Sequence, residues 1–351
     1  MTPSQKRDGS IDVLRCIALV GIVLAHISPP QVILQLRGFD VPLMVFLSGV
    51  VFLRRDESPL DLWYLVRYWG RRIKRIIFPV WLFLILYYPF MYFLSGQIPS
   101  LAGSGMLDVF TLRTGWFVWI FRVFLIVALA APLLTVLTRR FNPGILYLAG
   151  VAILLLLEWI SNPHYSGFRY YVLESIPYII VFMFGMLANR TGKRWMLLIT
   201  LAWLAVYVLL AVWKFRSIGQ YVNTGTCKYP PRLYYLAYGL GCIGVLWLIK
   251  DGLMKCLKRV PFLEKLLVFI GSHTMWIYLW HILFLEFMAD FCSAAAGAIR
   301  FTHLPFWFAR FAFVLVLSCF LTYFQSLLVA RWKSSHPDSP VLKWFYPVLV
   351  G

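Results

Sequence analysis

The sequence predicts an all-α membrane protein, a polytopic transmembrane helical bundle of about ten helices. Of its 351 residues, 61% are hydrophobic, 18% are aromatic and only 13% are charged, a composition far outside the range of soluble domains. Apolar runs long enough to cross the hydrocarbon core of a bilayer recur along the chain, and the segments between them are too short for a soluble domain. We therefore expect a single transmembrane domain over residues 1–351.

Ten apolar runs have the length and composition of membrane-spanning helices. Two of them, the second and the fifth in chain order, are short, so we expect tilted or broken helices there. The ten runs cover residues 11–28, 39–53, 76–95, 116–138, 145–160, 172–189, 195–213, 233–250, 266–290 and 306–330.

The basic residues between these runs predict how the chain is oriented. If the N-terminus is cytoplasmic, 22 Lys and Arg residues fall in cytoplasmic segments and 8 in external ones. Because cytoplasmic loops of membrane proteins are enriched in Lys and Arg, both termini are predicted to be cytoplasmic. The formal net charge of +19 is then explained by topology, and no nucleic-acid partner is expected.

The sequence argues against a cleaved signal peptide and against a framework of disulfides or metal-bound cysteines. The N-terminal apolar run follows a basic pair like a signal peptide, but it contains Asp12 and Arg15, and two prolines stand where a small-residue cleavage site would be needed. The six cysteines are scattered singly, without CxxC pairs or metal-type spacing. We therefore expect the first run to be retained as a span, with no disulfide framework and no metal site.

The first span carries three ionisable residues on one face. Arg15 and His26 are eleven residues apart, which is about 20° short of the same helical direction and about 16 Å along the axis, and Asp12 lies three residues before Arg15. Taken singly, Asp12 and Arg15 could reach the membrane interface and His26 could be a hydrogen-bonded packing residue. As a triplet they favour a functional site, because buried ionisable groups are costly in a membrane.

A second histidine is predicted at the same depth. In the run 266–290, His281 follows Tyr278 by three residues, and it lies about 22 Å from the cytoplasmic end at a rise of about 1.5 Å per residue. His26 lies about 24 Å from that end of its own span. The shared level predicts one site that contains both imidazoles.

A basic cluster precedes the third span in a segment read as a cytoplasmic loop. It consists of Arg71, Arg72, Lys74 and Arg75, ahead of Pro79. Positive-inside topology and anionic lipid headgroups alone would explain such a cluster. Arg72 and Arg75, three residues apart, also have a spacing suited to holding a phosphate by forked hydrogen bonds.

Two further sets of residues are candidates for substrate binding. Ser48, next to Gly49, lies inside the second span, where small residues serve either close helix packing or a site. The acidic residues Glu174, Glu286 and Asp290 all lie near the predicted outer ends of their spans. Ion pairing is one explanation, and a polar vestibule that holds a sugar is the other.

These motifs, in this order, resemble acyltransferase family 3, a family of bacterial integral membrane proteins. The resemblance lies in Asp-x2-Arg-x10-His at residues 12–26, an aromatic-rich segment ending in Ser48 and Gly49, and Arg-x-x-Arg at residues 72–75 ahead of a proline-containing helix. A Trp-Phe pair at residues 116–117 and Tyr-Leu-x-His at residues 278–281 complete it. The segment with Pro42 is similar to the sugar-acetylating branch of the family.

The resemblance implies ten core helices, an acyl-CoA donor taken from the cytoplasm, and transfer of the acyl group to a hydroxyl of a cell-envelope or secreted glycan. Many members carry an additional SGNH hydrolase-like domain after the bundle. This sequence is expected to be the form without that domain.

The sequence therefore predicts a bacterial inner-membrane O-acyltransferase, in particular an O-acetyltransferase that uses acetyl-CoA and a polysaccharide or lipid-linked sugar acceptor. His26 is assigned as the general base, because a neutral imidazole can take a hydroxyl proton near pH 7; an acyl-imidazole on His26 is the variant mechanism. Arg15, paired with Asp12, would orient CoA or stabilise developing negative charge from the cytoplasmic side, and His281 would line the site or assist proton transfer. Membrane lipids are further partners, and homo-oligomerisation is left open. The alternative function is a proton-coupled transporter or flippase for a glycolipid or small anion.

Overall fold

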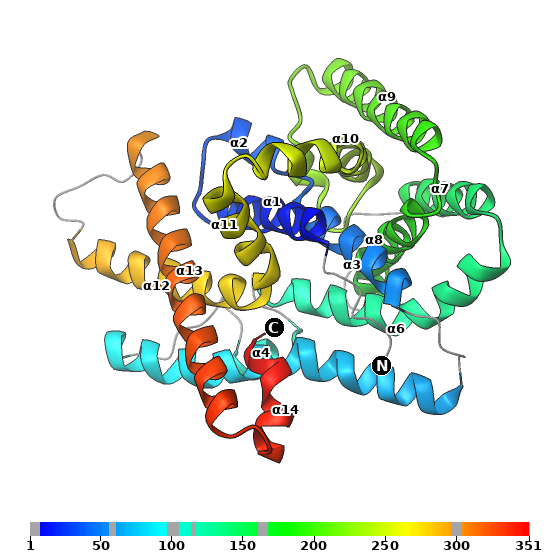
Figure 1. Cartoon of the computed structure of the whole chain (residues 1–351). Coiled ribbons are helices and arrows are strands. Elements are labelled where there is room, and N and C mark those ends of the chain that lie inside the picture. The colour runs from blue at the N-terminus through cyan, green and yellow to red at the C-terminus, as the bar shows by residue number, and fades with distance from the viewer. Residues whose placement is uncertain are drawn as a thin grey trace. The chain divides into compact units, whose positions relative to one another are not determined.

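The computed structural model describes residues 8–55, 61–96, 105–113, 117–160, 168–295 and 304–350. All regular secondary structure in these residues is helical (Figure 1), which confirms the prediction of an all-α fold. The chain divides into two compact units. The first comprises Met1–Ile22, Gln31–Asp56 and Leu134–Ser272, and the second comprises Val23–Pro30, Glu57–Leu133 and His273–Gly351.

The first unit is built around two helix pairs. Helix α10 packs along α9, and α3 packs against both α8 and α10 (Figure 1). The remaining helices of the unit are arranged at their sides and ends. The elements are α1 (Gly9–Ala25), α2 (Gln31–Leu36), α3 (Asp40–Arg55), α7 (Pro143–Ile160), α8 (Phe168–Ala188), α9 (Lys193–Ile218), the 3-10 turn η1 (Thr224–Cys227), α10 (Leu233–Leu257) and α11 (Pro261–Ser272).

The contact between α3 and α8 depends on two glycines. A Cβ atom on Gly49 of α3 would fall onto the carbonyl oxygen of Phe182, and one on Gly185 of α8 would fall onto the carbonyl oxygen of Phe46. Small residues let membrane helices approach until their backbones touch. Of the two roles open to the Ser-Gly pair of the second span, Gly49 therefore serves close packing.

The second unit is held together by α12 and α13. Helix α12 packs along α13 and against α4, and α14 packs against α4 and α13 (Figure 1). Two indole N–H groups of α12 fix these contacts: Trp280 donates to the side-chain oxygen of Gln325, and Trp276 donates to the carbonyl of Val348, both at 2.9 Å. The elements are α4 (Leu62–Ser95), α5 (Met106–Phe110), α6 (Trp119–Arg140), α12 (Thr274–Ala295), α13 (Leu304–Ser335) and α14 (Pro340–Leu349). Two helices cross the division: α6 belongs to the first unit from Leu134 on, and α1 belongs to the second from Val23 on.

Each of the ten predicted spans coincides with a helix or a helix pair, so this is a multi-pass membrane protein. In the described part of the chain, seven helices are long and apolar enough to cross a membrane, and eight if the bent pair α11 and α12 is one span. Helix α1 has 17 residues, and the apolar part of α8, Leu173–Ala188, is also short. The cytoplasmic location of both termini stays a prediction.

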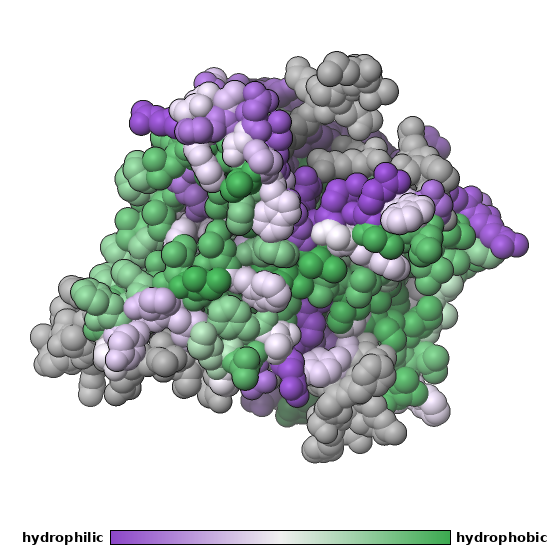
Figure 2. Space-filling model, turned by 90° about the horizontal axis from the view of Figure 1, so that it is seen from below, coloured by the Kyte–Doolittle hydropathy of each residue, from purple (hydrophilic) through white to green (hydrophobic). Residues whose placement is uncertain are grey.

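Large apolar side chains cover much of the surface, as lipid contact requires. Figure 2 shows apolar residues over a broad part of one face. On α9, for example, Leu198, Leu201 and Leu209 are all exposed. In a soluble protein such a surface would promote association, whereas in a membrane it faces hydrocarbon chains.

Two predicted boundaries are wrong. Residues 62–75, predicted as a loop, form the first part of α4, because the Asp61 side chain caps the helix by accepting from the N–H of Tyr64 and no proline interrupts it before Pro79. The predicted span 266–290 is broken at His273 into α11 and α12. Next to the break, a Cβ atom on Gly271 would fall onto the carbonyl oxygen of Asp12, so α11 ends in close backbone contact with α1.

Candidate functional site

His26 lies in the turn directly after α1 and not inside a helix. The helix ends at Ala25, Ser28 has a left-handed backbone with φ of 53°, and two prolines follow. Residues that precede proline are disfavoured in the α conformation, so the helix must end here. The half-buried imidazole of His26 is thus held at a helix end, next to the segment that leaves the helix.

His26 and His281 are in direct contact in the second unit. The Nδ1 atom of His26 lies 2.9 Å from Nε2 of His281, and their ring centroids are 5.1 Å apart. His281 is 0% exposed, and its Nδ1 atom is hydrogen-bonded to the carbonyl oxygen of Tyr278, one turn earlier on α12. The sequence predicted that these two histidines share one level, and the structure brings them together.

Tyr278 connects this pair to the Trp-Phe motif. Its hydroxyl donates to the carbonyl of Phe117 at 2.7 Å, and its ring packs edge-on against Phe121, with centroids 5.4 Å apart. The Tyr278 and His281 rings lie 4.8 Å apart. Trp116, the other member of the motif, lies outside the described residues. Two segments distant in sequence therefore support the same imidazole.

The basic cluster forms part of α4, in the same unit as the histidine pair. The guanidinium of Arg72 lies over the ring of Tyr68 at 5.2 Å, and the ammonium of Lys74 lies over the ring of Trp344 on α14 at 4.0 Å. Arg71 and Arg75 are exposed. An aromatic partner orients a cation without neutralising it, so the cluster keeps its positive charge and can attract anions.

Asp12 and Arg15 form the predicted pair on α1, in the first unit. The Nη1 atom of Arg15 lies 3.4 Å from a carboxylate oxygen of Asp12. Asp12 is buried and Arg15 is partly exposed. The contact holds the guanidinium of Arg15 beside Asp12, near the start of α1.

The residues assigned to the acceptor fall in different parts of the chain. Ser48 donates its hydroxyl to the carbonyl of Met44 in its own helix. Glu174 is buried in α8 of the first unit, and Glu286 is partly exposed on α12 of the second. The side chain of Asp290 lies outside the described residues. The polar vestibule that these acidic residues were assigned to line stays a prediction.

One buried charge cluster was missed in the sequence. Asp40 is 0% exposed and lies 2.5 Å from Nη1 of Arg37, with the buried Lys228 nearby in the turn after η1. Burial lowers the pKa of Lys228 to about 8, Arg37 contributes in the same direction, and Asp40 opposes both. The only sequence signal was the spacing of three between Arg37 and Asp40, because Lys228 lies almost two hundred residues further on.

Among the described residues, no group of three or more His, Cys, Asp or Glu side chains has a geometry that could hold a metal ion. A pair of hydrogen-bonded imidazoles, one buried and one partly exposed, can accept and return a proton at the exposed ring.

Comparison with known proteins identifies the family. The model of an acyltransferase domain, that of acyltransferase family 3, matches residues 8–325, which include both histidines, the α4 basic segment and the Asp12–Arg15 pair. No curated protein and no solved structure matches the chain. Since the match covers most of the sequence, the chain belongs to acyltransferase family 3.

Proposed function

We propose that this protein is an O-acyltransferase of the bacterial inner membrane that uses acyl-CoA, in particular acetyl-CoA, from the cytoplasm. The acceptor is a hydroxyl of a cell-surface or exported polysaccharide, or of its lipid-linked precursor. The observation that supports the proposal most is the hydrogen bond between His26 and His281, because it gives the histidine proposed as general base a defined partner in a protein of an acyltransferase family.

The hydrogen bonds around His281 favour one tautomer of each histidine. A carbonyl oxygen only accepts, so Nδ1 of His281 must donate its proton to Tyr278. The Nε2 atom of neutral His281 then has a lone pair and accepts from Nδ1–H of His26. This leaves the lone pair of His26 on Nε2, where it can take a proton from a substrate.

The chemistry follows from that assignment. Nε2 of His26 removes the proton of the acceptor hydroxyl while its oxygen attacks the thioester carbon of acyl-CoA. The tetrahedral intermediate collapses, the carbon–sulfur bond breaks, and the imidazolium of His26 returns the proton to the sulfur. The products are a sugar ester and CoA thiol. During the step, neutral His281 accepts a charge-assisted hydrogen bond from the imidazolium, which stabilises the positive charge.

The basic cluster of α4 is proposed to bind the donor, acyl-CoA. CoA carries several phosphate groups, and guanidinium groups bind phosphate by forked hydrogen bonds. Arg72 and Arg75 are assigned to these phosphates, with support from Arg71 and Lys74. Arg15, fixed by Asp12, is assigned to negative charge on the CoA part of the donor. The donor's pantetheine arm is roughly long enough to cover the approximately 16 Å of helix between Arg15 and His26.

The acceptor is proposed to approach from the opposite side of the membrane. On this proposal Glu286, on α12 like His281, contacts sugar hydroxyls, and Glu174, Asp290, Ser48 and Tyr278 are further candidates for acceptor binding. Sealed inverted vesicles test the route. Radiolabelled acetyl-CoA added to the exposed cytoplasmic face should label a glycan acceptor in the lumen, and labelling only with both substrates on one face would contradict it.

The function is tested by measuring release of CoA thiol from acetyl-CoA by the purified full chain, with and without an acceptor glycan. His26→Ala should lower turnover by about 10²- to 10⁴-fold, the effect expected for loss of a general base. His336→Gln is the matched control, because His336 is exposed and follows α13, and this variant should keep full activity.

Release of CoA thiol distinguishes an acyltransferase from the alternative function, a transporter or flippase. A transporter or flippase would consume no acetyl-CoA at all. Near-normal O-acylation by the His26→Ala protein would contradict the role of His26, even if the protein is an acyltransferase. A stable label on His26 after incubation with donor alone would favour the acyl-imidazole variant.

A further inference from the structure

A cavity of about 450 Å³ lies in the first unit, where α7 and α9 begin. Cavities that hold small molecules typically measure roughly 300–1,000 Å³, so this one is large enough for a ligand. Its lining comes from two short connections and the first turns of the helices that follow them. The lining residues are Asn142, Pro143, Gly144, Tyr147, Arg190, Thr191, Gly192, Trp195 and Ile199.

The surroundings of the cavity are strongly positive. Residues 139–144 and 189–194 contain five basic residues and no acidic one, and Arg190 lines the cavity itself. The starts of α7 and α9 add the positive ends of two helix dipoles, and Gly192, the N-cap of α9, has no side chain to cap the first N–H groups. The electrostatics of the cavity therefore favour an anion.

The polar groups of the cavity are held in place by the protein. The guanidinium of Arg190 donates to the carbonyl of Thr138 at the end of α6, which fixes the arginine while its other N–H groups can bind a ligand. The Thr191 hydroxyl donates to the carbonyl of Leu187 and lies 3.4 Å from the hydroxyl of Tyr147, from which it can accept. The guanidinium of Arg190, held in this way by the carbonyl of Thr138, is the cavity's donor for phosphate oxygens.

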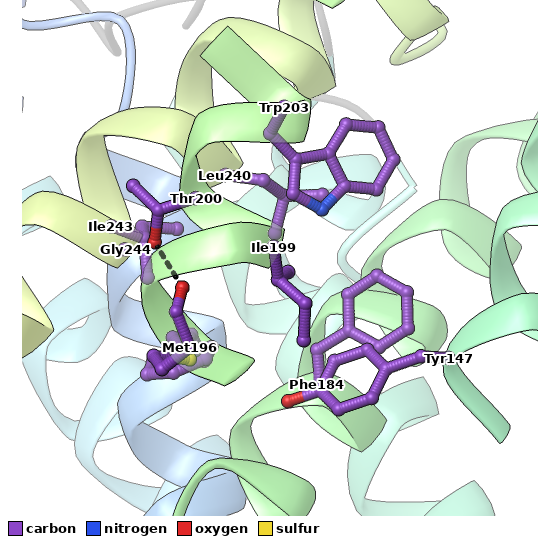
Figure 3. A pocket seen from close by; sticks show the side chains of 10 residues that line it. Tyr147, Phe184, Met196, Ile199, Thr200, Trp203, Leu240, Ile243 and Gly244 are labelled. Carbon is purple, nitrogen blue, oxygen red and sulfur yellow. Dashed lines mark hydrogen bonds between the residues drawn. The ribbon is translucent and has the colours of Figure 1, made fainter. Parts of the chain in front are cut away.

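Large apolar side chains at and next to the cavity lining are exposed, which would be unfavourable if the site opened only to water. Leu148 on α7 is 73% exposed and Trp195 on α9 is 68% exposed. A second, very small cavity of about 20 Å³ shares the lining residues Tyr147 and Ile199 and is lined mostly by apolar side chains of α8, α9 and α10 (Figure 3). Charge at one end and apolar walls beside it match a lipid.

We propose that this cavity binds the phosphate headgroup of an anionic phospholipid, with an acyl chain along the exposed apolar surfaces of α7 and α9. Arg190 and the uncapped start of α9 contact the phosphate. Tyr147 and Trp195 contact the glycerol region, where amphipathic aromatic side chains are favoured. The proposal concerns a site in the first unit and does not depend on the acyl-transfer chemistry of the histidine pair.

Native mass spectrometry of the purified full chain tests the site, with phosphatidylglycerol and phosphatidylcholine titrated separately. The wild-type protein should bind one phosphatidylglycerol about tenfold more tightly than phosphatidylcholine. Arg190→Gln should remove most of that difference, and Arg190→Lys should keep part of it, because lysine retains the charge but not the fork. Thermal unfolding of each variant checks that the fold is retained.

Arg259→Gln is the matched control, since it removes the same charge from an exposed position directly after α10. If it weakens binding as much as Arg190→Gln does, general attraction by basic loops explains the result and the site is refuted. Equal binding of the two lipids would also refute it. Displacement of the lipid by inorganic phosphate or by CoA would refute the lipid site too, because the cavity would then bind a soluble anion. Retention of phosphatidylglycerol in the presence of phosphate or CoA supports the lipid site.

Discussion

The contact between His281 and His26 can be tested without removing the base itself. His281→Leu places an apolar side chain of similar size at a position that is 0% exposed. The substitution removes Nε2, the atom of His281 that accepts the hydrogen bond from His26. His281→Gln is the matched variant, because its side-chain oxygen can occupy the position of Nε2. The two variants differ mainly in whether Nδ1 of His26 has an acceptor.

The magnitude follows from the state of His26 during transfer. A hydrogen bond to a charged group contributes about 1.5–3 kcal/mol, and about 1.4 kcal/mol corresponds to a factor of ten. The 2.9 Å hydrogen bond becomes charge-assisted only once His26 has taken the proton. A neutral hydrogen bond already contributes about 0.5–1.5 kcal/mol before transfer, so only the difference of about 1–1.5 kcal/mol affects kcat. His281→Leu should therefore lower kcat by about 5- to 12-fold and leave KM for acyl-CoA nearly unchanged, whereas His281→Gln should keep most of kcat.

The assay is initial-rate release of CoA thiol at several donor concentrations, with size-exclusion chromatography to show that each variant is folded. If the Leu and Gln variants lose equal activity, His281 contributes only packing. The role of its Nε2 atom as hydrogen-bond acceptor for His26 would then be contradicted. If His281→Leu keeps wild-type kcat, the tautomer of His26 is fixed by something else. A change confined to KM would move His281 from proton transfer to donor binding.

Three more predictions follow from the site and the fold. Replacing Arg72 and Arg75 together by Gln should raise KM for acyl-CoA several-fold with little change in kcat, since remote phosphate contacts contribute uniform binding; the effect should shrink at high salt, and loss of membrane insertion instead would make the cluster a topology signal. The pKa of Lys228 is lowered from 10.5 to about 8, so the unfolded chain binds more protons between these values and stability should rise as pH increases from about 8 to about 10.5; Lys228→Met should remove that rise in thermal-unfolding experiments. Gly49→Ala should destabilise the protein by at least about 1–3 kcal/mol through overpacking, while Gly70→Ala, where a Cβ would have nothing within 4 Å, should not; equal thermal stability of the two variants would contradict the close approach of α3 and α8.

Much of the fold could be predicted because a membrane forces long apolar helices. All ten apolar runs coincide with helices, since backbone groups in hydrocarbon must be satisfied within the helix. The short amphipathic helix α14 was missed, because its ten residues are too few to stand out as a span. The start of α4 was missed because a segment rich in basic residues was interpreted as a loop. Basic residues are also compatible with a helix, and here the side chain of Asp61 caps the first turn.

The site was only partly predictable. Spacing along the first span and the run 266–290 put His26 and His281 at one level, which requires nothing beyond helix geometry. Their actual contact, and the hydroxyl of Tyr278 on the carbonyl of Phe117, depend on how distant helices pack. The cluster of Arg37, Asp40 and Lys228 shows the same limit, because no local pattern relates residues so far apart.

The reciprocal contact of Gly49 and Gly185 makes the two positions energetically dependent on each other. Each glycine lies against a backbone carbonyl of the opposite helix, so a side chain at either one must push α3 and α8 apart. Once one substitution has separated the helices, the second meets a gap that already exists and should cost less than it does alone. The two substitutions together should therefore cost less than the sum of their separate effects, and the effect of a substitution at residue 185 depends on which residue is present at 49.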